Sequence, residues 1–516
     1  MKFYKIVLTS AICIGLSFFN SANAAWKNNT RTDFLNNSLI IYTINIRTFN
    51  ADDKNGNGII EFDKGETSGN FINAISRLDE LKNKGINALH ILPITPVGKM
   101  KALGTAGSLY SAASFNSLNP QLKDNNTNIS VEDQARSFIR MAHEKGIAVI
   151  VDVPACGSYD LFLQSPELFV KDESGQPVIP SDWTDVRLFD TGTESKLNND
   201  VVRLYEKYVD YVMSLGVDGI RADVAHSKPA QFWKEVINYS RQKDSQFLWL
   251  AESSDSWKEA VSPKAVYTPY DKLLKAGFDG FYGSFFNLKN WEKASELRNQ
   301  VKMVQNLEKL IGEKKSVIGS FTTHDELSPI LEKGVIYSRM IMWLNATLPV
   351  NSYFVDGFDT GDTYLYPWEN QKASVTYTDD EDYFVHRGKI DIFNFSRKPS
   401  GKNIFLEEEF AKSNKTKQIV LDILKTGEFK FLKTSSDRVF AYMINDAKRA
   451  VIVVGNLDFK NPIENVKITM PKFYKIDSAY PVALLNLNAP KTENNKFITD
   501  LYSGEIQVFI IENEDK

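Results

Sequence analysis

The sequence predicts an α/β protein with a (β/α)8 TIM barrel, and two observations carry this prediction. Short apolar runs rich in β-branched and aromatic residues recur eight times between residues 39 and 355. The segments between them have the apolar spacing of amphipathic helices, as expected for parallel strands joined by helical crossovers. An open doubly wound sheet is the alternative, but it rarely needs eight such units.

The eight predicted strands are bounded by helical segments or by turn residues. In chain order they are Leu39–Phe49, Ile86–Ile94, Ile147–Val153, Val217–Val224, Phe247–Glu252, Gly277–Tyr282, Val317–Thr322 and Asn351–Val355. One intervening helix is expected to start at Ser130, which has capping-box spacing to Asp133, and to end at Gly146.

Two stretches break this alternation. Residues 155–197, after the third strand, are irregular and rich in Asp, Ser and Pro, which predicts a short excursion from the barrel. From about residue 435 short strands follow one another without helices, which predicts a C-terminal antiparallel β-sandwich. The predicted domains are a barrel over residues 25–434 and a sandwich over residues 435–516.

Residues 1–24 have the features of an export signal peptide. Lys2 and Lys5 precede an apolar stretch, and Ala22-Asn23-Ala24 is an A-x-A cleavage site. The apolar stretch is short for a bilayer span, so an uncleaved membrane anchor is the weaker alternative. No other segment is long and apolar enough to cross a membrane. We therefore expect a secreted or periplasmic protein without membrane insertion after signal removal.

Charge and cysteine content limit the expected binding partners and the ways in which the fold can be stabilised. The chain has 61 basic and 65 acidic residues, and loss of the signal's two lysines changes the net charge from −4 to −6, so nucleic acid is not an expected partner. Cys13 belongs to the signal, which leaves Cys156 without a disulfide partner. Stability must come from a large core, which 43% hydrophobic residues can supply.

Three carboxylates stand at the carboxyl ends of predicted strands, where the chemistry of such barrels takes place. Asp223 and Glu252 end the fourth and fifth strands, and Asp325 follows the seventh, with Arg221 and His324 beside them. Converging carboxylates raise at least one pKa, as a proton donor near neutral pH requires. A retaining glycosidase uses such a pair ~5 Å apart. An ordinary salt bridge explains each acid alone, but the three together predict a glycosidase site.

These residues resemble motifs of the α-amylase family of glycoside hydrolases, family 13, and the resemblance covers nearly the whole chain after the signal. The family's G-F-R-x-D motif is similar to Gly219–Asp223, its strand-five motif to Trp249–Glu252, and its N-H-D motif to Thr323–Asp325. By this resemblance the excursion corresponds to the family's domain B and the terminal sandwich to its domain C.

The resemblance also implies roles for the five charged residues. Asp223 would be the nucleophile, Glu252 the general acid/base, and Asp325 the carboxylate that grips sugar hydroxyls and distorts the ring. Arg221 would keep the nucleophile ionised, and His324 would bind hydroxyls of the sugar in subsite −1.

Three further residues are implied to contact substrate. Tyr110 lies in "GSLYSAASFNSLNP", which is similar to the family's "GSPYAVxDYYxINP", and would stack under the −1 sugar; a core tyrosine is the alternative. Asp152 keeps the acidic position of the family's first motif, D-x-x-x-N-H. His226 lies in "RADVAHSKP", which is similar to the D-x-x-H-x-K-P motif of the family's maltosyltransferase branch.

The first motif is otherwise altered, because Cys156 and Gly157 replace its Asn and His. In the family that Asn helps to hold calcium between the barrel and domain B, and that His contacts the 6-hydroxyl of the −1 sugar. The calcium also uses a residue four places beyond the nucleophile, often His, which here is Ser227. We therefore expect that calcium to be absent, and Cys156 to be a packed thiol without a catalytic role.

A different cation site is predicted near the N-terminus. In "DKNGNGIIE" the side chains of Asp53, Asn55, Asn57 and Glu61 and the carbonyl of Ile59 have the spacing of oxygen ligands around a hard cation. The stretch resembles a calcium loop after strand one in oligosaccharide-cleaving members of the family; a solvated turn is the alternative. We expect Ca²⁺ in this loop and no organic cofactor.

The predicted function is a retaining α-glycosidase that hydrolyses α-glucosidic bonds in α-glucans or malto-oligosaccharides through a covalent glycosyl-enzyme intermediate. One alternative is an α-glucan transglycosylase of the same fold, since Cys156 and the segment Pro166–Gly175 are also similar to the maltosyltransferase branch. That branch lacks the histidine that this chain has at His324. The other is a non-catalytic glucan-binding protein, given the lost Asn and His. Retention of all three carboxylates argues against the second alternative.

Overall fold

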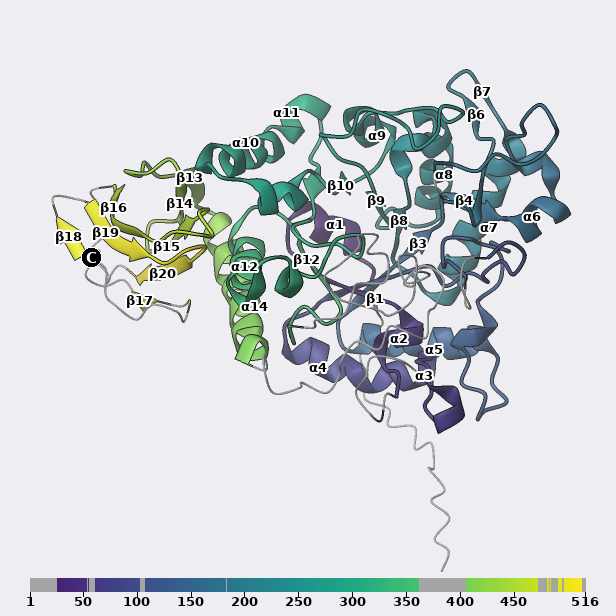
Figure 1. Cartoon of the computed structure of the whole chain (residues 1–516), viewed down its shortest axis with the longest axis horizontal. Helices are drawn as coiled ribbons and strands as arrows, with labels where there is room; N and C mark the ends of the chain where they lie inside the picture. The colour runs from purple at the N-terminus through teal and green to yellow at the C-terminus, as the bar shows by residue number, and fades with distance from the viewer. Residues whose placement is uncertain are drawn as a thin grey trace, which may run out of the picture.

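The computed structural model describes residues 26–52, 54, 61–102, 107–181, 183–361, 405–471, 480–481, 483, 491–493 and 496–512. Its centre is a sheet of eight parallel strands surrounded by helices (Figure 1). In spatial order the strands are β11 (Ser316–Val317), β10 (Gly280–Phe281), β9 (Leu248–Ala251), β8 (Gly219–Ala222), β3 (Ala148–Val153), β2 (Ala88–Ile91), β1 (Ile40–Ile44) and β12 (Ser352–Val355).

The sheet closes on itself between its two outer strands, β11 and β12. Ile318, just after β11, forms a parallel bridge with Asn351, just before β12. The N–H of Gly319 donates to the Asn351 carbonyl at 2.7 Å, and the Asn351 N–H donates to the Val317 carbonyl at 2.9 Å. The predicted (β/α)8 barrel is confirmed.

Helices cover the outer face of the barrel, so the strands are buried on both faces and read as continuous apolar runs. Among the described residues, the α-helices before the terminal sheets are α1 (Thr30–Leu35), α2 (Ile46–Phe49), α3 (Phe71–Ala74), α4 (Leu78–Asn83), α5 (Val131–Glu144), α6 (Tyr159–Gln164), α7 (Asn199–Leu215), α8 (Ala230–Lys243), α9 (Tyr270–Ala276), α10 (Ala294–Gln305), α11 (Leu307–Ile311), α12 (Pro329–Thr347) and α14 (Phe405–Leu424). Helix α5 begins as predicted, because the Ser130 hydroxyl accepts the Asp133 N–H at 3.1 Å.

The predicted strands differ most from the structure at the ends of the first and the seventh strand. The first predicted strand extends to Phe49, but β1 ends at Ile44 and Ile46–Phe49 is helix α2. The Asn45 side chain accepts the Arg47 N–H at 3.1 Å and so caps this helix, which apolar composition alone does not reveal. The seventh predicted strand extends to Thr322, whereas pairing in β11 ends at Val317.

The excursion after the third strand is confirmed as a small irregular unit. It contains β4 (Cys156–Ser158), α6, β5 (Val186–Leu188), β6 (Gly192–Thr193) and β7 (Lys196–Leu197). Strand β4 pairs antiparallel with β5, so the start of the excursion is tied back to its middle.

The C-terminal region is a sandwich of two antiparallel sheets, as predicted. One sheet has the order β13 (Glu428–Phe431), β14 (Val439–Asn445), β15 (Arg449–Asn456), β20 (Ile506–Glu512) and β17 (Tyr480–Pro481). The other has the order β16 (Ile463–Thr469), β19 (Lys496–Leu501) and β18 (Lys491–Glu493). Buried side chains from both sheets share one core, in which the rings of Phe497 and Phe509 lie 5.0 Å apart. Strand β13 precedes residue 435, where the sequence predicts the sandwich to begin.

The terminal sheets and the excursion lie at opposite ends of the molecule (Figure 1). Helices α12 and α14 pack against each other between the barrel and the terminal sheets. Within the described part of the chain, no helix has both the length and the apolar character to span a membrane.

Candidate active site

A cavity of about 360 Å³ opens at the carboxyl ends of the barrel strands. The three predicted acids, Asp223, Glu252 and Asp325, all line it. The remaining lining residues come from strand ends and loops: Ser108, Tyr110, Cys156, Trp183, Asp185, Val186, Val224, Trp257, Tyr282, Phe286, Thr323 and Glu326. The fold therefore brings to one cavity two carboxylates that directly follow β8 and β9 and a third from the loop after β11.

Arg221 lies beneath the cavity and joins two of its acids. Its Nη1 donates to Asp223 Oδ1 at 2.9 Å, and its Nη2 lies 2.9 Å from Glu252 Oε1. Strands β8 and β9 set this arrangement, because Ala222 and Ala251 are paired in register and each precedes one of the acids. A fully buried guanidinium thus compensates negative charge at the floor of the cavity.

Main-chain donors hold the same two acids. The Ala155 N–H donates to Asp223 Oδ2 at 2.9 Å, and the Val224 N–H donates to Glu252 Oε2 at 2.6 Å. Burial and repulsion from Glu252 raise the pKa of Asp223. Burial also raises the pKa of Glu252, which in addition faces the negative charge of Asp325. Repulsion between the two carboxyls therefore favours a state in which one of them is protonated, and an acid paired with a nucleophile needs such a state.

Asp152, at the end of β3, is the hub of a buried network below the cavity. Its Oδ1 contacts His90 Nε2 at 2.6 Å, and its Oδ2 accepts from the Tyr110 hydroxyl at 2.5 Å and from Arg221 Nη1 at 3.1 Å. Burial disfavours its charge, but Arg221 and His90 outweigh this effect and lower the pKa of Asp152 to about 2. Asp152 is 0% exposed, so it positions Tyr110 and Arg221 instead of making the predicted contact with substrate.

Tyr110 forms part of one wall of the site, and His324 packs behind it. The Tyr110 hydroxyl lies 2.9 Å from His324 Nε2, and the two rings are stacked with centroids 6.2 Å apart. Burial and the charge of Arg221 lower the pKa of His324 far below its usual range, so the imidazole is neutral. Tyr110 lines the cavity, whereas His324 is 1% exposed and supports it from below; Asp325 beside it is half exposed.

The altered first motif contributes through its backbone. The Ala155 N–H holds Asp223, and the Ala155 carbonyl accepts from the buried Lys228 ammonium at 2.8 Å. The contact between Ala155 and Lys228 was not predicted from the sequence. The one sequence feature that points to it is the S-K-P sequence after His226, which contains Lys228. Cys156 packs against Val186, and burial raises the pKa of its thiol to about 12. The thiol is therefore protonated and packed, as predicted.

Gly157 stands where the family has a histidine, and the structure leaves no room for one. A Cβ atom at this position would lie 2.8 Å from Phe169 Cζ and 2.9 Å from Phe189 Cζ. Real Cβ atoms essentially never approach other atoms so closely. The two rings occupy the space that a side chain at position 157 would need.

Replacing Gly157 by Ala should lower the free energy of unfolding by about 1–3 kcal/mol, because the new methyl group overpacks against two rings. Chemical denaturation of both proteins measures this difference. Phe169→Leu should recover part of the loss in the Gly157→Ala protein while destabilising the wild type. Additive effects of the two substitutions would contradict the steric explanation.

Aromatic residues outside the predicted set form the upper walls of the cavity. Trp183 and Asp185 enter from the excursion, on the side of Cys156. Trp257 and Phe286 also line the cavity, with ring centroids 6.3 Å apart. These residues lie in loops without periodicity, so the sequence offered only the general excess of aromatic residues as a signal. Flat apolar faces beside polar groups suit the binding of sugar rings.

His226 does not have the predicted position at the substrate. It is 5% exposed and is absent from the described residues that line the cavity. Its ring packs against Trp257 with centroids 4.8 Å apart, and burial lowers its pKa to about 4. The neutral His226 thus supports a wall residue. Ser227, next to it, accepts the Val261 N–H at 3.0 Å.

Most of the predicted calcium loop lies outside the described residues, namely Asp53, Asn55, Asn57 and Ile59. Glu61 is described, and its carboxylate forms an ion pair with Lys64. The buried carboxylate of Glu66 accepts the N–H groups of Lys54 and Glu61, each at 2.8 Å. Glu66 therefore ties together the two ends of the loop.

No protein-family model matches the chain. An α-1,4-glucan:maltose-1-phosphate maltosyltransferase from Picrophilus torridus is 24% identical over 468 residues, which cover 86% of this chain and 68% of that protein. A second such maltosyltransferase, from Bifidobacterium animalis, is 27% identical over 36% of this chain, and the match spans only 27% of that protein. Alpha-amylase 3 of Dictyoglomus thermophilum is 22% identical over 95% of both chains.

Solved structures agree with the fold. An alpha-amylase from Lactobacillus plantarum superposes with a TM-score of 0.67 and 19% identity, covering 92% of this chain and 99% of that chain. A noncanonic maltogenic alpha-amylase from Thermotoga neapolitana has a TM-score of 0.66 and 19% identity, covering 93% and 100%. The chain is therefore similar in sequence to maltosyltransferases and an alpha-amylase, and in fold to solved alpha-amylases, which agrees with the resemblance of its motifs to the α-amylase family of glycoside hydrolases, family 13.

Proposed function

We propose that this protein is an exported retaining α-glycosidase that hydrolyses α-glucosidic bonds in α-glucans or malto-oligosaccharides. One observation carries the proposal: Asp223 and Glu252 share one buried guanidinium at the floor of a cavity that Asp325 also lines. Such a pair supplies both a nucleophile and an acid to a bound sugar.

In the first step Asp223 attacks the anomeric carbon while Glu252 protonates the departing glycosidic oxygen. Protonation of Glu252 removes the repulsion that raises the pKa of Asp223, and the two donors, from Arg221 and the Ala155 amide, then favour the carboxylate form of Asp223. Glu252 faces Asp325, which favours the protonated form that an acid needs. The products of this step are a glycosyl ester on Asp223 and a free sugar hydroxyl.

In the second step Glu252, now ionised, takes a proton from water, and the water oxygen displaces Asp223 from the anomeric carbon. Two inversions retain the α configuration. Tyr110 provides a ring face beneath the sugar, held in place by Asp152 and His324. Asp325, which lines the cavity and is half exposed, accepts hydrogen bonds from hydroxyls of the same sugar in this proposal.

The reaction class is tested by product analysis with maltopentaose. Hydrolysis should yield only sugars shorter than the substrate, and proton NMR should show that the first product is the α anomer. Products longer than maltopentaose would show that a sugar replaces water as acceptor. A β anomer as first product would contradict the retaining mechanism.

An α-glucan transglycosylase is the second candidate. The contact between Ala155 and Lys228 favours the transglycosylase, because Lys228 belongs to the S-K-P sequence that resembles the maltosyltransferase branch. The relative from Picrophilus torridus is also named as a maltosyltransferase. The two candidates share every catalytic residue and differ only in the acceptor. A protein that binds maltopentaose and never converts it would instead favour a glucan-binding role.

Calcium binding by the loop from Asp53 to Glu61 is part of the proposal. The spacing of its oxygen ligands supports it, and so does Glu66, which holds the loop ends at Lys54 and Glu61. Calcium at one hundred times its Kd would stabilise the fold by about 2.7 kcal/mol. Removal of calcium with a chelator should therefore lower Tm by at least about 2 °C.

Calorimetry with and without the chelator measures this shift. Asp53→Asn should abolish it, while Asp63→Asn, just outside the loop, should leave it unchanged. An unchanged Tm of the wild type in chelator would contradict a calcium site in this loop.

Export is tested on the protein recovered from its producing cells. The proposed cleavage after Ala24 predicts an N-terminus at Ala25 and recovery outside the cytoplasm. Recovery of the intact chain in the membrane fraction would point to an anchor.

A further inference from the structure

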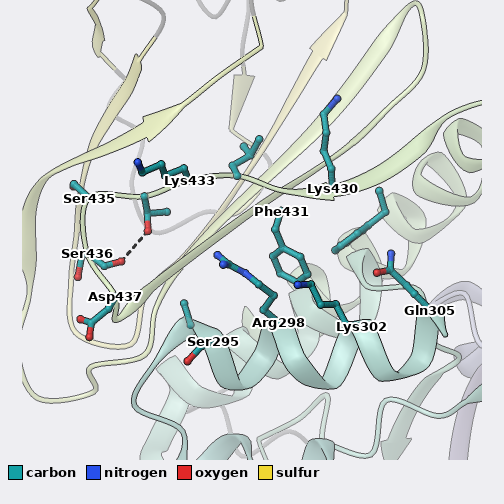
Figure 2. Close-up of a pocket in the computed structure, with 14 residues that line it drawn as sticks. Ser295, Arg298, Lys302, Gln305, Lys430, Phe431, Lys433, Ser435, Ser436 and Asp437 are labelled. Carbon is teal, nitrogen blue, oxygen red and sulfur yellow. Dashed lines mark hydrogen bonds between the residues drawn. The ribbon is translucent and has the colours of Figure 1, made fainter.

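A second groove, separate from the active-site cavity, lies between helix α10 and the edge strand β13 (Figure 2). It encloses about 810 Å³ and is lined by residues of α10 and of the segment 429–437. None of its lining residues lines the active-site cavity. The groove lies at the junction of the barrel and the terminal sheets, and the catalytic proposal assigns it no role.

The groove is cationic, although the chain as a whole has a net charge of −4. Its charged lining consists of four basic side chains and one acid: Arg298, Lys302, Lys430, Lys433 and Asp437. Lys430 is neutralised by Glu428 at 2.7 Å and points away from α10 (Figure 2). The other three basic side chains form no ion pair with a described residue. A local excess of unpaired positive charge attracts anions.

Arg298 and Lys302 are a like-charge pair one helical turn apart. Side chains at this spacing are neighbours, so the two positive charges repel each other. The one acid of α10, Glu296, does not relieve this, since it accepts the N–H groups of Glu292 and Lys293 at the start of the helix. An oxyanion between Arg298 and Lys302 would turn the repulsion into attraction.

Arg298 also carries an unsatisfied donor. Its Nε atom is buried and has no hydrogen-bond partner among the described residues. A buried N–H without an acceptor is costly, and native structures avoid it unless a water or ion supplies the acceptor. The Nε atom itself is inaccessible, so an anion in the groove would meet the outer nitrogens of the guanidinium instead.

The rest of the groove suits a sugar. The guanidinium carbon of Arg298 lies 5.4 Å from the centroid of Phe431, and Figure 2 shows Arg298 and Lys302 turned toward this ring. Ser295, Ser436 and the carboxylate of Asp437 lie toward one end of the groove. An apolar ring beside hydroxyl and carboxylate groups matches the apolar faces and hydroxyls of a saccharide.

We propose that this groove binds an anionic saccharide, whose phosphate or carboxylate group lies between Arg298 and Lys302 and whose ring lies against Phe431. Serine hydroxyls and Asp437 bind its free hydroxyls. The site goes beyond the catalytic function proposed above and does not depend on it.

Calorimetric titration of the full chain carrying Asp223→Asn, to prevent turnover, tests the proposal with four probes. Trigalacturonate and glucose 6-phosphate are anionic saccharides, maltotriose is the neutral control, and inorganic phosphate is the free anion. At least one anionic saccharide should bind, more tightly than inorganic phosphate and less tightly as salt is raised. The tighter of the two identifies whether a carboxylate or a phosphate is the natural group.

Arg298→Gln with Lys302→Gln should weaken this binding at least about tenfold and leave maltotriose binding unchanged. Lys309→Gln, on the neighbouring helix α11 and outside the groove, is the matched control and should change neither. The proposal is overturned if neither anionic saccharide binds, or if the double variant binds it as well as the parent does. Equal affinity for inorganic phosphate would overturn the saccharide assignment.

Discussion

Replacement of Asp223 by Asn should lower kcat on malto-oligosaccharides on the order of 10⁴-fold or more, while substrate binding is retained. The amide keeps the size of the carboxylate, but it cannot form the glycosyl ester. Steady-state kinetics gives the loss in rate, and calorimetric titration with maltopentaose gives the affinity. Asp210→Asn, at an exposed acid on α7 that pairs with Lys243, is the matched control and should leave kcat unchanged.

A small nucleophile distinguishes loss of Asp223 from general damage. Asp223→Ala leaves space beside the anomeric carbon, and azide should restore turnover by forming a glycosyl azide of inverted configuration. Glu252 remains in place to protonate the leaving group. Residual activity within about a hundredfold of the wild type would contradict the role of nucleophile.

Replacement of Glu252 by Gln should lower hydrolysis of malto-oligosaccharides by about 10²- to 10⁴-fold, because the leaving oxygen is no longer protonated. The effect should depend on the leaving group. An aryl maltoside with an acidic phenol needs no such proton, so the first equivalent of phenol should be released as a burst. Turnover should then stall, because no base activates the water that cleaves the ester on Asp223.

The pH profile gives a second test of Glu252. Its pKa is raised by burial and by Asp325, so the acid form persists to higher pH than in an ordinary glutamate. The kcat/KM of the wild type should fall as pH rises through this pKa, and the Glu252→Gln variant should lose that descending limb. Glu235→Gln, at an exposed glutamate on α8 that does not line the cavity, is the matched control and should leave the profile unchanged. If the Glu252→Gln variant kept a descending limb with the same midpoint, a group other than Glu252 would be the proton donor.

The barrel and its catalytic acids could be predicted from sequence because both depend on local patterns. Strands buried on both faces are continuous apolar runs, and the carboxyl ends of parallel strands meet at one mouth. Asp223, Glu252 and Asp325 follow three such runs, so their convergence is a property of the topology. Boundaries were less accurate, since the helix at Ile46–Phe49 depends on a cap made by Asn45.

Burial could not be predicted for the residues around the acids. Asp152 and His324 were expected at the substrate, yet both lie beneath Tyr110 and position it. His226 was also expected there, and it packs behind Trp257. A sequence motif shows that a residue belongs to the site. It does not show whether that residue contacts the ligand or supports a neighbour that does.

The sequence by itself determined the barrel, the terminal sandwich and the three carboxylates, because hydrophobic periodicity and strand order specify them. Only the tertiary structure decided the single guanidinium shared by Asp223 and Glu252, the bridging peptide of Ala155, and the rings that fill the space at Gly157. These features depend on distances between loops and strands far apart in the chain. Loop residues have no periodicity, so their neighbours become known only when the chain is folded.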